Sequence, residues 1–71
     1  MKLKPVHIEA LKECARWSDA GEPYWWRRAS MKHLLAEGLV EVARETHNER
    51  LTEYVPSPAG RALLAEEKRD A

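Results

Sequence analysis

The spacing of apolar residues predicts an amphipathic helix near the start of the chain. Between Val6 and Trp17 apolar side chains recur at helical spacing, and charged side chains occupy the opposite side of the helical wheel. Pro5 suits a first helical turn, where its missing N–H costs nothing, and the turn-forming residues 18–23 end the helix near Trp17 or Ser18. The residues expected on its apolar side are Val6, Ile8, Ala10, Leu11, Cys14, Ala15 and Trp17.

A further helix that turns directly into a strand is predicted between Ser30 and Val42. The residues that form its apolar face are Met31, Leu34, Leu35 and Leu39. Gly38 falls where a residue in the left-handed conformation ends a helix, because glycine pays no Cβ penalty there. We therefore expect this helix to run from Arg28 or Ser30 to Glu37.

The segment between these two helices has two interpretations. Pro23 can open a short helix that runs through Arg28, or the segment is an extended connector. We favour the short helix. Trp25 and Trp26 are adjacent and point in different directions in either conformation, so we expect one of them in the core and the other partly exposed.

Alternating residues after Gly38 predict a β-hairpin. Strands are expected at Val40–Arg44 and Arg50–Val55, joined by the polar turn 45–49 and ended by a proline. Ser57 and Pro58 are the preferred residues for a helix N-cap and a first helical position, so a last helix should begin there.

These elements predict a mainly helical α+β domain of order α-α-α-β-β-α. The chain length suits a single domain over residues 1–71, with a core from about 5 to 66 and flexible ends at 1–4 and 67–71. A two-stranded hairpin is not stable alone, so this one must lean on the helices.

Composition and charge limit the kinds of function that this chain is expected to have. Twelve basic and twelve acidic residues give a formal charge of zero, so any attraction to nucleic acid must come from a local patch. Cys14 is the only cysteine, and no secretory signal or long apolar run is present, which suggests a cytoplasmic protein without membrane contact. The three histidines lie on separate elements with no metal-ligand spacing, and no phosphate loop or nucleophile motif occurs. We expect no metal, no cofactor and no enzymatic activity.

Two landmarks in the sequence resemble those of winged helix-turn-helix DNA-binding domains. The first is Ser30-Met31 followed by Leu34 and then by Gly38-Leu39-Val40. The second is Tyr54 followed by Ser57-Pro58-Ala59-Gly60-Arg61-Ala62, which is similar to the Thr-Pro-x-Gly-Arg-Ala run of that family. Together they cover roughly residues 28–65. They resemble MarR-like transcription regulators and small winged-helix proteins of phages and mobile elements.

The resemblance implies a recognition helix at about 28–37 in the major groove of double-stranded DNA and a wing at about 40–55 on its backbone. It also implies a transcription regulator, expected as a homodimer on two half-sites. On the helix, the residues that would face the duplex are Arg28, Ser30, Lys32 and His33, and Arg27 just before it could touch phosphate. On the wing, the residues near the minor groove or sugar-phosphate backbone would be Arg44, His47, Asn48 and Arg50.

A protein partner is the alternative. The zero net charge, the glutamates of the wing and the Trp25–Trp26 pair motivate a winged helix that binds protein, such as a phage-encoded inhibitor or an accessory factor, because exposed tryptophan is enriched at interfaces.

Overall fold

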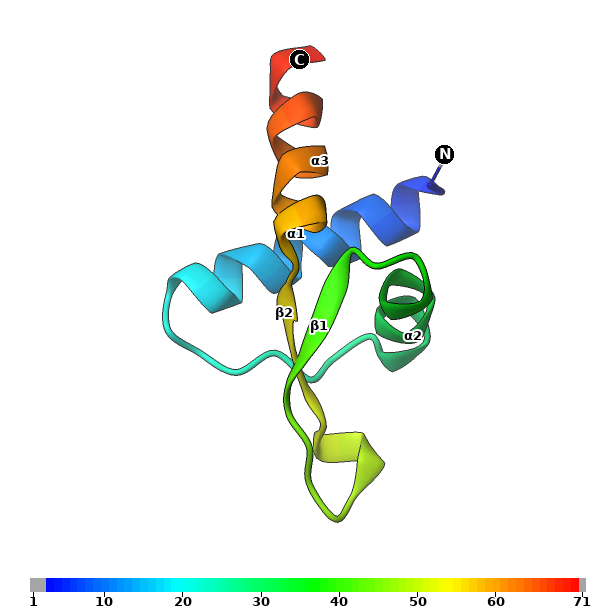
Figure 1. Cartoon of the computed structure of the whole chain (residues 1–71), viewed down its shortest axis with the longest axis vertical. Helices are drawn as coiled ribbons and strands as arrows, with labels where there is room; N and C mark the ends of the chain where they lie inside the picture. Colours follow the sequence, from blue (N-terminus) through cyan, green and yellow to red (C-terminus); the bar gives the residue numbers. More distant parts are fainter. Residues whose placement is uncertain (1–2, 71) are drawn as a thin grey trace.

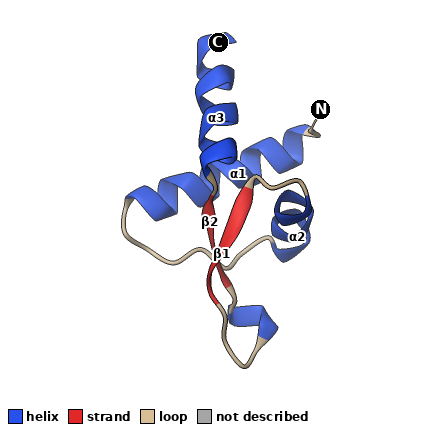
Figure 2. Cartoon of the chain, viewed as in Figure 1, coloured by secondary structure: helices blue, strands red, loops and turns tan. Residues whose placement is uncertain are grey.

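The chain is a mixed α+β structure of three helices and a two-stranded antiparallel hairpin (Figure 2). The structure, a computed structural model, describes the backbone of residues 3–70 and the side chains of those residues other than 49 and 68–70. The elements are α1 (Pro5–Asp19), α2 (Arg28–Ala36), β1 (Val40–Arg44), a 3₁₀ turn (Glu49–Leu51), β2 (Glu53–Pro56) and α3 (Pro58–Asp70). Of the ends expected to be flexible, residues 1, 2 and 71 lie outside the described residues.

Helix α1 lies across the middle of the molecule, with the other elements on two sides of it. In Figure 1, α3 rises on one side of α1, whereas α2 and the tip of the hairpin lie on the other side. Helix α3 extends well beyond the body, and the molecule is accordingly long, with extents of 40 × 23 × 17 Å. Helix α2 packs against α1 and β1, so it is held from two directions.

The core is small and comes from α1, α2, the connector and the hairpin. Its largest fully buried side chains are Tyr24, Leu11, Met31, Leu34, Val40 and Cys14. Leu63 and Leu64 of α3 pack against this cluster from outside. Met31 and Leu34 are on the core face as predicted, but Leu35 is 39% exposed and Val6 51% exposed, so both expectations were wrong. Each lies at the border of its helix's apolar stripe.

The predicted short helix at residues 23–28 is absent, and the element order α-α-α-β-β-α was wrong for that reason. The segment is an extended connector, the interpretation that we did not favour. Tyr24 forms an isolated antiparallel bridge with Tyr54, whose N–H donates to the Tyr24 carbonyl oxygen over 2.8 Å. Burial of the Tyr24 side chain and this backbone bond hold the connector against β2, where a helical turn would place the ring elsewhere.

The ends of α1 and α2 follow the same local design. Gly38 has φ of 75°, its N–H donates to Leu35, and the next N–H donates to Leu34, so a left-handed glycine ends α2 as predicted. Gly21, with φ of 78°, ends α1 in the same way. Two similar stops let both helices end abruptly, one before the connector and one before β1.

The hairpin begins as predicted and resumes later than predicted. Strand β1 occupies Val40–Arg44, but β2 begins at Glu53, because the residues before it form the 3₁₀ turn. Leu51, expected to alternate into the sheet, is 45% exposed in that turn. The register pairs Val42 with Tyr54 and is irregular between Val42 and Arg44.

Candidate nucleic-acid interface

Helix α2 offers a basic face. Its sequence, RASMKHLLA, contains Arg28 and Lys32 and no acidic residue. The two are four positions apart, which places them one above the other on the same side of a helix. Lys32 is exposed and Arg28 half-buried, and neither forms an ion pair with the carboxylates whose side chains the structure describes. Both are therefore free to meet an anion.

Arg27 lies just before this helix but is engaged within the molecule. Its guanidinium lies 3.3 Å from a carboxylate oxygen of Glu13 on α1. The other oxygen of Glu13 accepts a hydrogen bond of 2.9 Å from the Tyr24 hydroxyl. Arg27 also has φ of 51° and ψ of 51°, a left-handed conformation that non-glycine residues rarely adopt. Glu13 thus fixes the point at which the connector turns into α2, and Arg27 is better placed to orient the helix than to touch DNA.

Ser30 and His33 complete the part of the predicted site that lies on α2. Ser30 is half-buried and His33 is exposed. The His33 ring stacks on that of His7, with ring centroids 4.0 Å apart and planes inclined by 12°. No pattern in the sequence indicates that these two histidines meet, because they come from different helices and neither belongs to a spaced motif.

The predicted wing residues are exposed around the tip of the hairpin. Arg44, His47, Asn48 and Arg50 all have exposed side chains. The side chain of Asn48 forms a hydrogen bond within the turn: its oxygen accepts a bond of 3.0 Å from the backbone N–H of Arg50 and so shapes the turn. Glutamates accompany these cations, at positions 41, 45, 49 and 53, so the hairpin is acidic overall. The basic charge that could attract a phosphate backbone is concentrated on α2.

An aromatic cluster joins the connector to α1; it is made of Trp17 of α1 and of Tyr24, Trp25 and Trp26 of the connector. Trp26 lies against Trp17 (centroids 4.5 Å apart), Tyr24 (5.6 Å) and Trp25 (4.8 Å). The expectation that one of the adjacent tryptophans is buried was wrong. Trp25 is 37% and Trp26 40% exposed, and the fully buried aromatic side chain of the segment is Tyr24. Because the connector is extended, alternate residues share a side, which brings Tyr24 and Trp26 together against Trp17.

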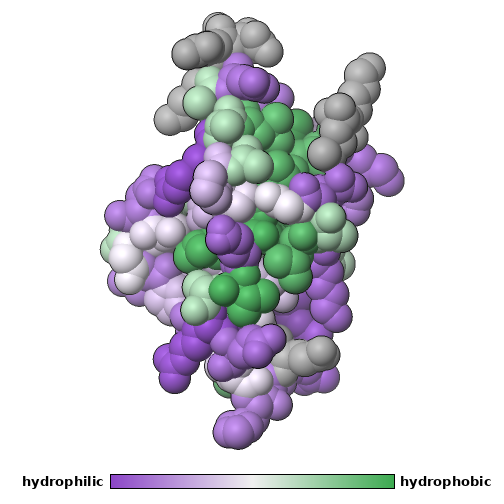
Figure 3. Space-filling model, in the orientation of Figure 1, coloured by the Kyte–Doolittle hydropathy of each residue, from purple (hydrophilic) through white to green (hydrophobic). Residues whose placement is uncertain are grey.

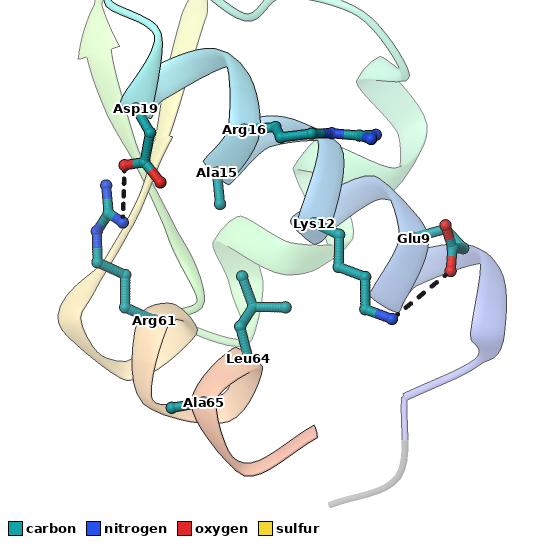
Figure 4. A pocket seen from close by; sticks show the side chains of 8 residues that line it. All are labelled: Glu9, Lys12, Ala15, Arg16, Asp19, Arg61, Leu64 and Ala65. Carbon is teal, nitrogen blue, oxygen red and sulfur yellow. Dashed lines mark ion pairs between the residues drawn. The ribbon is translucent and has the colours of Figure 1, made fainter. Parts of the chain in front are cut away.

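A shallow groove of about 620 Å³ lies between α1 and α3 (Figure 4). Its floor is formed by Ala15, Leu64 and Ala65, and an ion pair between Arg61 and Asp19, 3.1 Å long, crosses one end. None of its lining residues comes from α2 or the hairpin, so it is separate from the basic face.

The described residues contain neither a membrane-spanning helix nor a metal-binding cluster. No helix among the described residues is both long and apolar enough to cross a membrane. Within the same part of the chain, no group of three or more metal-ligating side chains gathers. The only cysteine, Cys14, is fully buried, and burial raises the pKa of its thiol to about 11, which makes it a poor nucleophile in the folded protein.

Comparisons with family models, curated proteins and solved structures found no match to this chain.

Proposed function

We propose that this chain is a small winged-helix protein that binds double-stranded DNA through α2, with the hairpin as its wing, and acts as a transcription regulator. The observation that carries the proposal is the charge of α2. It is the one described helix or strand with a surplus of basic residues, and it lies on the same side of α1 as the hairpin (Figure 1). A helix that presents basic side chains beside a hairpin suits the major groove with phosphates on either side.

The domain that we propose is reduced compared with the family it resembles. Two helices precede the hairpin, and the extended connector stands where a third would be. Glu13 and Tyr24 supply the support for the start of α2 that the missing helix would otherwise give. The acidic hairpin implies a modest wing contribution, restricted to its exposed arginines at 44 and 50.

Salt dependence of binding tests the proposal. Fluorescence anisotropy with a labelled mixed-sequence DNA duplex should give an affinity that falls steeply as salt rises. Arg28→Ala and Lys32→Ala should each weaken binding and reduce the slope of log K against log salt by about one, the contribution of one phosphate contact. Lys12→Ala, an exposed lysine in the groove between α1 and α3, is the matched control and should leave the slope unchanged. An unaltered slope in the Arg28/Lys32 double variant would exclude this interface.

A protein partner is the second candidate, and exposed apolar surface favours it. Figure 3 shows apolar surface at the centre of the face that carries the hairpin, bordered by hydrophilic residues. Leu35 and Val42 are each more than a third exposed, as are the two connector tryptophans. Such surface adds little to phosphate binding, whereas exposed aromatic and aliphatic side chains are typical anchors of protein interfaces.

Substitutions at Trp25 and Arg28 distinguish a protein partner from DNA. If a protein is the partner, tagged wild-type chain should retain it from host extract, and Trp25→Ala should lose it while Arg28→Ala retains it. Leu51→Ala, which removes an exposed apolar side chain from the 3₁₀ turn of the hairpin, is the control. If DNA is the partner, Trp25→Ala should keep the wild-type salt slope.

A further inference from the structure

The contact between the first turn of α1 and the end of α2 is built from two stacked imidazole rings. His7 is the third residue of α1, and His33 lies in the last turn of α2. Their rings are nearly parallel, 4.0 Å apart. His7 is half-buried, and its Nδ1 atom is buried without a hydrogen-bond partner. A neutral imidazole tolerates this position by leaving Nδ1 unprotonated, whereas a protonated one must place an N–H there that finds no acceptor.

The surroundings of His7 oppose a positive charge. Lys4 and His33 are the charged or titratable groups that act on it, from the start of its own helix and from α2, and both disfavour its cation. The first turn of α1 contains no acidic residue, and the positive end of the helix dipole points there. No described carboxylate forms an ion pair with either ring. Burial is the largest of the causes that lower the pKa of His7 below its usual 6.5, ahead of the electrostatic effects of His33 and Lys4.

We propose that His7 and His33 form a proton-operated latch, which holds the first turn of α1 against α2 near neutral pH and releases it in mild acid. Protonation of His7 places a cation against the His33 ring, beside Lys4, and leaves a buried N–H unpaired. The two helices then separate at this end. The latch requires no DNA and stands apart from the proposed function.

The direction of the effect follows from linkage. Because the folded state lowers the pKa of His7, the unfolded chain binds more protons as the pH falls below about 6.5. The stability that the neutral stack contributes is present above that pH and is lost below it. The unfolding equilibrium constant should rise with acidity by up to about tenfold per pH unit for each additional proton that unfolding takes up.

Urea unfolding followed by tryptophan fluorescence, at about pH 7.5 and about pH 5, tests the latch on the whole chain. The wild type should be several-fold easier to unfold at the lower pH. His7→Phe keeps a flat ring at the contact but cannot be protonated there, so it should lose most of this difference. His47→Gln, at the exposed tip of the hairpin, is the matched control and should behave as the wild type does. A His7→Phe protein with the full wild-type pH dependence would overturn the proposal.

Nuclear magnetic resonance of the wild type gives a second test that needs no variant to fold. The His7 ring should titrate below the usual histidine pKa of 6.5, and amide protection in the first turns of α1 should fall in acid before protection in β1 does. A His7 midpoint at or above 6.5, or a loss of protection in both elements at the same pH, would contradict a local latch.

Discussion

The side-chain hydroxyl of Ser57 donates a hydrogen bond of 2.6 Å to the backbone carbonyl of Gly38, the residue that ends α2. The same oxygen accepts a bond of 3.0 Å from the N–H of Gly60 and so caps α3. A further bond of 3.0 Å joins the Ser57 N–H to the Leu39 carbonyl. Ser57 therefore joins the end of α2 to the start of α3, although the two are separated along the chain by the whole hairpin.

Ser57→Ala should destabilise the domain by about 2 kcal/mol, the sum of a lost cap and a partly buried carbonyl left without its hydroxyl donor. Urea unfolding at neutral pH measures this. Ser30→Ala is the matched control, because Ser30 is half-buried on α2 and forms none of the side-chain hydrogen bonds described, and it should cost less than about 0.5 kcal/mol. Equal losses in the two variants would contradict the bridging role.

Gly60→Ala should be the more damaging change, although alanine normally favours a helix. A Cβ at this position would overlap the backbone carbonyl of Leu39 and also contact Leu11. Backbone cannot move aside as a flexible side chain does, so we expect a loss of at least about 2 kcal/mol. Thermal unfolding followed by circular dichroism checks it, with Ala59→Ser, on the exposed side of the same turn, as control. A wild-type melting temperature in Gly60→Ala would show that α3 is not packed as closely as described.

Because Arg27 has a left-handed backbone, two substitutions there distinguish the loss of its ion pair with Glu13 from the strain of a positive φ. Arg27→Ala and Arg27→Gly both lose the ion pair with Glu13, but only glycine also relieves the strain of a positive φ. Arg27→Gly should therefore be more stable than Arg27→Ala by about 1 kcal/mol. Denaturant midpoints give the comparison directly. If alanine proves the better substitute, the connector does not turn through a left-handed residue.

Two buried acids should make the domain sensitive to alkali. Burial raises the pKa of Cys14 to about 11, and burial together with the hydrogen bond to Glu13 raises the pKa of Tyr24 above its usual range. Both groups ionise more readily in the unfolded chain, so stability is full below about pH 9 and declines as pH rises. Cys14→Ala and Tyr24→Phe should each flatten that decline in urea unfolding at high pH. An unchanged decline in the double variant would contradict the assignment.

Local signals in the sequence were sufficient where the structure is decided locally. The stop at Gly38, the strand that follows it and the cap at Ser57 each depend on the conformational preferences of a few adjacent residues, and all three are confirmed. These elements make up a mixed α+β fold, and the winged helix is a proposal.

Features that depend on residues far apart were missed. Pro23 is a good first residue of a helix, but the bridge from Tyr24 to Tyr54 competes with that preference and wins. The same distant contact decides which aromatic residue is buried. The stacked histidines and the role of Glu13 at the start of α2 were missed for the same reason. Of the candidate site, the sequence identified the basic side chains of α2 but not that Arg27 is held by an internal carboxylate.

The bridge between Tyr24 and Tyr54 also bears on how the chain folds. It closes a loop that contains α2, β1 and the hairpin turn, so its two residues are far apart in the sequence. A two-stranded hairpin gains little stability by itself, and Tyr24 is its contact on the free side of β2. Contacts between distant residues form late because loop closure must precede them. We therefore expect α1 and α2 to form early and the aromatic cluster to become ordered in the last step, together with the hairpin.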